Sequence, residues 1–211
     1  DLTTGTILFS TVTSVGNSNN TISSCDIGPA GTNLPANGIV SIGTAANENA
    51  NNTIQNCNIF DFFSATLISR GVFISSNSNS WTISGNKFYQ TNLRSYTVAN
   101  THRAIHVAAG VNYMVSNNTI GYSSSTGAGN YLMTASAAAL FVGIELSVAT
   151  TSLSTIQGNT ITAITLTTTS SAATTNGALC GISVTSGNIS INNNLIGGTT
   201  GVDLFKLIPT T

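Results

Sequence analysis

The heptapeptide Thr53-Ile54-Gln55-Asn56-Cys57-Asn58-Ile59 decides the fold, because variants of it recur along the whole chain. Corresponding apolar positions of successive copies lie about 29 to 41 residues apart. A period of this length is typical of stacked units, each of which is too small to bury a core of its own. The sequence therefore predicts a repeat protein. The other copies are Thr21–Ile27, Ile83–Phe88, Val115–Ile120, Ile156–Ile161 and Ile191–Ile196.

A second motif precedes each heptapeptide and consists of a Gly or Ala followed by alternating apolar residues. Alternation over four or five residues, rich in Ile and Val, is typical of a strand with one buried face. Each repeat is therefore expected to open with a strand. The copies of this motif are Gly5–Leu8, Gly38–Ile39, Gly71–Ile74, Ala104–Val107, Gly143–Leu146 and Gly181–Val184.

The heptapeptide itself predicts a bend. Ile54 and Ile59 are five positions apart, and an odd spacing cannot place both side chains on one face of a straight strand. The third residue after the first apolar position is expected at the bend, because Asn tolerates left-handed backbone and bonds local peptide groups through its amide. Stacked side chains at this position should form a ladder. They are Cys25, Cys57, Asn86, Asn118, Asn159 and Asn194.

Short strands that bend rather than reverse, with each copy lying on the last, describe a right-handed parallel β-helix. No regular hairpin signal favours a stack of β-meanders. On its repeated Asn-x-Ile phrase, the chain resembles the pectate-lyase-like superfamily of right-handed parallel β-helix proteins, of the kind found in bacterial secreted and cell-surface proteins. The resemblance covers nearly all residues and implies an all-β solenoid of about six rungs with long loops on one side. The expected rungs are 5–37, 38–70, 71–103, 104–142, 143–180 and 181–211.

Composition places such a solenoid outside the cytoplasm. Charged residues are 5% of the chain and the formal net charge is −1, whereas about 25% is usual in globular domains. A surface of hydroxyls and amides attracts neither nucleic acid nor an anionic membrane. The longest mainly apolar run, 137–144, is far too short to span a bilayer. We expect a secreted or cell-surface location and no membrane insertion.

The chain begins almost inside a repeat, at Asp1, whereas solenoids normally cap their exposed ends. This indicates a single β-helix segment, 1–211, excised from a longer chain. Its expected partners are further rungs or domains of that chain, a polysaccharide or surface protein, and a second copy stacked end to end. The largest insertions, 121–142 and 162–179, are expected to be loops on one side, where solenoids often bind ligands.

The three cysteines suggest no metal site. Cys25 and Cys57 occupy one position in neighbouring repeats, close enough for a disulfide, although two small thiols that replace ladder amides are the preferred interpretation. Cys180 has no equivalent partner. No Cys-x-x-Cys or His-x-x-His spacing occurs, so we expect no bound metal and no cofactor.

Aligning the opening strands produces one cluster of ionisable groups. The alignment places His106 and Glu145 as vertical neighbours on the outward face, in a column with Val40, Phe73 and Ser183. Arg70 and Arg103 share a position just ahead of their strands, and His102 adjoins Arg103. A carboxylate beside an imidazole can exchange protons, and arginines can hold a uronate or sulfate. Glu145 and His106 are therefore the catalytic candidates, and Arg70, His102 and Arg103 the ligand-binding candidates.

Two functional classes follow. The resemblance implies that enzymes of the superfamily use such a strand face, with paired aspartates or with arginine and calcium-binding carboxylates. This sequence has neither an Asp-Asp pair nor a carboxylate cluster on that face. The favoured interpretation is a non-catalytic structural or adhesion module that displays loops for surface or glycan contact. The alternative is a lyase or glycoside hydrolase that acts on an acidic polysaccharide.

Overall fold

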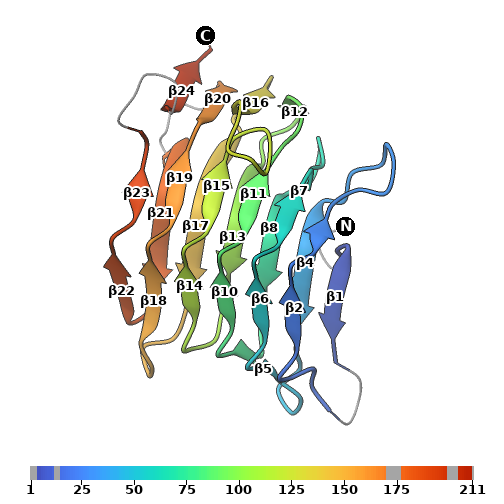
Figure 1. Cartoon of the computed structure of the whole chain (residues 1–211), viewed down its shortest axis with the longest axis vertical. Helices are drawn as coiled ribbons and strands as arrows, with labels where there is room; N and C mark the ends of the chain where they lie inside the picture. Colours follow the sequence, from blue (N-terminus) through green and yellow to red (C-terminus); the bar gives the residue numbers. More distant parts are fainter. Residues whose placement is uncertain (1–3, 12–14, 170–176, 199–203, 211) are drawn as a thin grey trace.

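A computed structural model describes residues 4–11, 15–169, 177–198 and 204–210, which form parallel strands stacked in sheets (Figure 1). The opening strands of the six repeats form one six-stranded sheet, and the first halves of the heptapeptides form a second. The first sheet consists of β1 (Ile7–Ser10), β4 (Asn37–Ile42), β8 (Ser69–Ile74), β13 (Thr101–Val107), β17 (Leu140–Ser147) and β21 (Leu179–Ser186), in that order. The second consists of β2 (Thr21–Ser23), β6 (Thr53–Gln55), β10 (Thr82–Ser84), β14 (Met114–Ser116), β18 (Ser154–Gln157) and β22 (Ile189–Asn192).

The second half of each heptapeptide forms the third sheet. It consists of β3 (Asp26–Ile27), β7 (Asn58–Phe60), β11 (Lys87–Tyr89), β15 (Thr119–Gly121), β19 (Thr160–Thr162) and β23 (Leu195–Ile196). A fourth sheet contains β12 (Arg94–Tyr96), β16 (Tyr131–Ala135), β20 (Ile164–Thr168) and β24 (Phe205–Pro209), and β5 (Asn49–Ala50) pairs with β9 (Ser78–Asn79).

Neighbouring strands of every sheet come from successive repeats, so the chain advances from the blue to the red end of Figure 1 one repeat at a time. This arrangement is all-β and is consistent with a β-solenoid. In the described ranges there is no helix long and apolar enough to cross a membrane.

The core is built from columns of equivalent apolar side chains. Ile54 is paired in register with Ile83, and Ile59 with Phe88, and all four are fully buried. The two columns lie on either side of the bend that the odd spacing predicts. The left-handed backbone, however, falls on the residue before the expected one: Asn56 has a φ of 54° and Asn117 a φ of 55°. Equivalent residues with positive φ are Ser24, Gly85, Gly158 and Asn193.

The residue after this corner points into the stack and forms the amide ladder. The Nδ2 atom of Asn118 donates to Asn159 Oδ1 at 2.9 Å and to the carbonyl of Ile83 at 2.8 Å. Its Oδ1 accepts from the backbone N and the Nδ2 of Asn86, each at 3.0 Å. The same pattern continues from Asn159 to Asn194. The amides of Asn86, Asn118 and Asn159 thus each join three successive repeats.

At the other end of the ladder, the backbone N of Cys57 donates to Asn86 Oδ1 at 3.0 Å. Cys57 is buried and Cys25 is exposed, and both are free thiols, as is Cys180. Burial raises the pKa of the Cys57 thiol. A thiol occupies the ladder position in these repeats without continuing the chain of amides.

The glycine that begins the apolar motif within β8 and β17 is explained by close approaches to the neighbouring strand and to the third sheet. A Cβ on Gly143 would lie 2.6 Å from the carbonyl oxygen of Gly181 and 3.0 Å from Ile161 Cδ1. A Cβ on Gly71 would lie 2.6 Å from the carbonyl oxygen of Ala104 and 2.7 Å from Phe88. Gly71 and Gly143 therefore have room for little more than a hydrogen atom, because the apolar column of the third sheet packs directly against them.

We expect Gly143→Val to lower the free energy of unfolding by about 1 to 3 kcal/mol, since both the backbone and Ile161 would have to shift. Urea unfolding, followed by the fluorescence of the single buried tryptophan, Trp81, measures the change. Met114→Val on the exposed side of β14 is the control. Equal unfolding midpoints for the two variants would contradict the tight packing of this column.

The fourth sheet corrects one expectation. The insertions 121–142 and 162–179 were expected to be loops, but they contain β16 and β20, which pair in parallel. Tyr131, Met133 and Ala135 alternate inward along β16. The period-2 pattern was present in the sequence, although no heptapeptide marks it. Sequence 170–176, within the second insertion, lies outside the described residues.

Candidate functional site

The outward face of the first sheet contains the predicted column. His106 is paired with Phe73 on one side and with Glu145 on the other, and Glu145 with Ser183. Phe73 is in turn paired with Val40. Arg103 is paired with Arg70 in the neighbouring strand. Four of the five candidate residues, Arg70, Arg103, His106 and Glu145, therefore lie together on β8, β13 and β17.

These four side chains bind one another. Arg103 Nε donates to Glu145 Oε2 at 2.9 Å, and His106 Nε2 lies 3.4 Å from Glu145 Oε1. Arg70 Nε donates to His106 Nδ1 at 3.0 Å. The side chain of Glu145 is only 9% exposed. Both carboxylate oxygens are thus held by neighbours in the adjacent strand.

The ring of Phe73, on β8, packs against two members of the cluster. It stacks on His106 with centroids 5.1 Å apart, and Arg70 Cζ lies 4.0 Å from the Phe73 centroid. Arg70 is 6% exposed, and its Nη1 atom is buried without a hydrogen-bond partner. Desolvation, together with the positive charge of Arg103, lowers the pKa of Arg70 to about 10.

The imidazole of His106 is neutral in this setting. Because Nδ1 accepts from Arg70, the ring proton resides on Nε2, facing Glu145. Burial, followed by the charges of Arg103 and Arg70, lowers the pKa of His106 to about 3. A general acid or base works best when its pKa is near the operating pH. This imidazole is therefore poorly suited to exchange protons near neutrality.

His102 does not belong to this cluster, although it was predicted to lie beside Arg103. It points into the core and is fully buried, stacked between Phe62 and Phe141 at centroid distances of 5.1 and 6.0 Å. The physical reason is strand alternation: adjacent residues of β13 point to opposite faces. Its Nδ1 lies 3.1 Å from Tyr96 Oη, and its Nε2 hydrogen-bonds Tyr131 Oη.

His102 ends a buried polar network that the sequence analysis did not find. Gln90 Nε2 lies 3.3 Å from the Tyr131 hydroxyl, and Arg94 Nε donates to Gln90 Oε1 at 2.6 Å. Arg94 also forms an ion pair with Asp61. Burial, followed by the charges of Arg94 and Arg103, lowers the pKa of His102 to about 3. No repeated motif contains these residues, so only the scarcity of charged groups could have drawn attention to Asp61 and Arg94.

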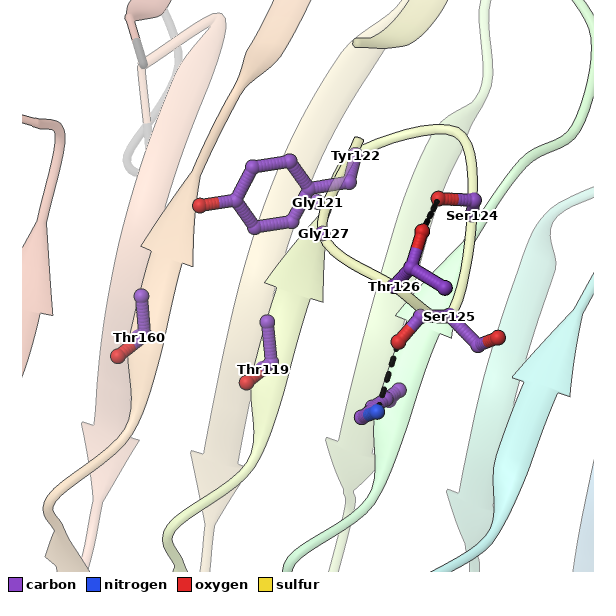
Figure 2. A pocket seen from close by; sticks show the side chains of 9 residues that line it. Thr119, Gly121, Tyr122, Ser124, Ser125, Thr126, Gly127 and Thr160 are labelled. Carbon is purple, nitrogen blue, oxygen red and sulfur yellow. Dashed lines mark hydrogen bonds between the residues drawn. The ribbon is translucent and has the colours of Figure 1, made fainter. Parts of the chain in front are cut away.

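A pocket of about 280 Å³ lies on the outer face of the third sheet, away from the predicted cluster. The segment 122–127 forms its roof, and side chains of β11, β15 and β19 form its floor (Figure 2). Thr119 pairs in register with Lys87 and with Thr160. Lys87 is the one charged residue in its lining.

A second hollow, of about 450 Å³, lies over the second sheet and its preceding corner. Its lining holds amides, hydroxyls and the apolar side chains of Met114 and Leu153, with no charged group. Across the described part of the chain, no three His, Cys, Asp or Glu side chains lie close enough to hold a metal ion.

No protein-family model matches the chain, and neither curated proteins nor solved structures give a significant match. The function of the chain is therefore inferred from the fold and from the outer faces of the first and third sheets.

Proposed function

We propose that this chain is a non-catalytic adhesion or display module of a secreted or cell-surface protein, and that it contacts glycans through its outer faces. We further propose that it winds as a right-handed parallel β-helix of six rungs, of the pectate-lyase-like kind. The parallel pairing of successive repeats supports this winding, because parallel crossover connections are right-handed in nearly all cases.

The observation that carries the proposal is the state of Glu145. This carboxylate is almost buried and bound by Arg103, and a neutral His106 faces it. A catalytic acid or nucleophile needs access to substrate, and a base needs a pKa near the working pH. A self-contained cluster instead favours the register of the stack, because its side chains join β8, β13 and β17.

The edge of the last repeat supports the expectation of a stacked partner. Ile191 and Ile196 pair in register with the fully buried Ile156 and Ile161, yet they are 49% and 48% exposed. Among the described residues, their strands β22 and β23 are the edge strands of their sheets, and an edge strand is a template for another strand. We propose that a further rung of parallel strands covers this surface.

Affinity electrophoresis through gels that contain neutral or acidic polysaccharides tests the glycan contact, with new reducing ends assayed in parallel. We expect at least one polysaccharide to slow the protein and none to be cleaved. Glu145→Gln and the exposed Glu48→Gln form a matched pair with the same charge change. Cleavage that disappears only in Glu145→Gln would show the alternative, an enzyme acting on a polysaccharide. Unretarded migration in every gel would overturn glycan contact.

A further inference from the structure

The roof of the third-sheet pocket is fixed to the sheet beneath it. Lys87 Nζ donates to the carbonyl oxygen of Ser125 at 2.7 Å. The Tyr89 side chain, two residues along β11, is buried and stacked on Phe60. Within the segment, the backbone N of Ser123 donates to the carbonyl of Ala128 at 3.0 Å. The pocket is therefore formed by a braced turn.

The lining of this pocket combines one ring with several hydroxyls. Figure 2 shows the ring of Tyr122 above the strands, with the side chains of Thr119 and Thr160 below it. The hydroxyls of Ser124 and Thr126 lie 2.9 Å apart across the roof. An aromatic face with convergent hydroxyls suits a sugar ring, which has apolar C–H faces and a polar edge.

The charge of the pocket comes from Lys87. An ammonium group has three donors, and one of them binds Ser125. The ion pairs among the described residues join Arg94 to Asp61, and Arg103 and His106 to Glu145, so none includes Lys87. This ammonium can therefore pair with an anionic group that enters the pocket.

We propose that the pocket is a subsite for one sugar unit with an anionic substituent, a carboxylate or a sulfate. The inference rests on the proposed glycan contact. Lys87 pairs with the anion, Tyr122 packs against the ring, and Thr119 and Thr160 bind its hydroxyls. The volume of about 280 Å³ is at the lower limit for small-molecule pockets, which begin near 300 Å³. It therefore accommodates a single unit rather than a length of polymer.

Titration of the isotope-labelled chain by NMR tests the subsite, with glucuronic acid, a sulfated galactose, unmodified galactose and inorganic sulfate as probes. We expect the acidic sugars to shift the amide signals of Thr119, Tyr122 and Ser124. Lys87→Gln should weaken their binding about tenfold, the loss of one charge-assisted hydrogen bond, and leave galactose unaffected. Lys206→Gln, at an exposed position of β24, is the charge-matched control.

The following results would contradict the subsite or the proposed function. Acidic sugars that bind Lys87→Gln and Lys206→Gln equally, or that shift signals elsewhere, would overturn the subsite. Inorganic sulfate that binds as tightly as the sulfated sugar would replace the sugar subsite with a simple anion site. If Lys87→Gln is still retarded by polysaccharide gels as the unaltered chain is, the subsite fails while the proposed function stands. If the unaltered chain is not retarded, the proposed function fails.

Discussion

Asn118→Leu is expected to lower the free energy of unfolding by about 3 to 5 kcal/mol. Leucine has similar branching but no amide, so the variant loses four hydrogen bonds at a site that is 1% exposed. It also leaves the carbonyl of Ile83 and the side chains of Asn86 and Asn159 without these partners. Each buried polar group left unpaired costs about 1 to 3 kcal/mol. Urea unfolding followed by Trp81 fluorescence measures the loss.

Asn92→Leu provides the control for this experiment. Asn92 is exposed, and its amide binds only the neighbouring Thr91 among the hydrogen bonds described, so a change within about 0.5 kcal/mol is expected. A loss in Asn118→Leu no larger than in Asn92→Leu would contradict a stabilising ladder. Loss of cooperativity in Asn118→Leu would instead show that the ladder couples the repeats.

The parts of the fold that repeat were accessible from sequence. The odd spacing between Ile54 and Ile59 required a bend. The register between neighbouring strands was also predictable, because slipping a strand by one residue exchanges its buried and exposed faces. The location of the bend was off by one residue. Asn occurs at both the corner and the ladder position, as in Asn117 and Asn118, and its preference for left-handed backbone does not distinguish them.

The parts of the fold that do not repeat could not be predicted from the sequence in the same way. β12 is a short strand, Arg94–Tyr96, and only its pairing with β16 and burial of Tyr96 identify it. The position of His102 was predictable in principle, because it adjoins the outward Arg103 in a strand. The ion pair of Asp61 with Arg94 was not predictable, since the lengths of the insertions do not determine the distance between the two segments.

The scarcity of charge has a structural consequence. Asp61, Arg94, Arg103 and Glu145 are buried or nearly buried in pairs that join neighbouring repeats. Such pairs contribute little net stability but disfavour other registers. Few charged groups remain for the surface, so the exposed Lys87 dominates the local field of the third-sheet pocket. Its placement there is the strongest electrostatic argument for ligand binding on this outer face.

Acidification from pH 7 to 4.5 is expected to lower the free energy of unfolding by about 4 to 6 kcal/mol through the two histidines. Their pKa values fall from an ordinary 6.5 to about 3 in the folded chain. The unfolded chain therefore takes up protons first, and stability, complete above pH 6.5, declines as the pH falls from 6.5 toward 3. Each histidine contributes about 1.4 kcal/mol per pH unit in this window.

Separate variants assign this decline to its sources. His102→Gln removes the fully buried imidazole and should remove half or more of the decline, whatever it does to stability at pH 7. His106→Gln should remove the remainder of the decline. The contribution of His106 is smaller to the extent that Glu145, whose Oε1 lies 3.4 Å from Nε2, stabilises the protonated imidazole. Urea unfolding at pH 7, 5.5 and 4.5 provides the slopes, and the interval from pH 7 to 5.5 lies above the range in which ordinary carboxylates titrate. The double variant, His102→Gln with His106→Gln, is the decisive test. If its free energy of unfolding still declines with pH as steeply as that of the unaltered chain, groups other than the histidines cause the acid sensitivity. Neither imidazole would then be held neutral by its surroundings.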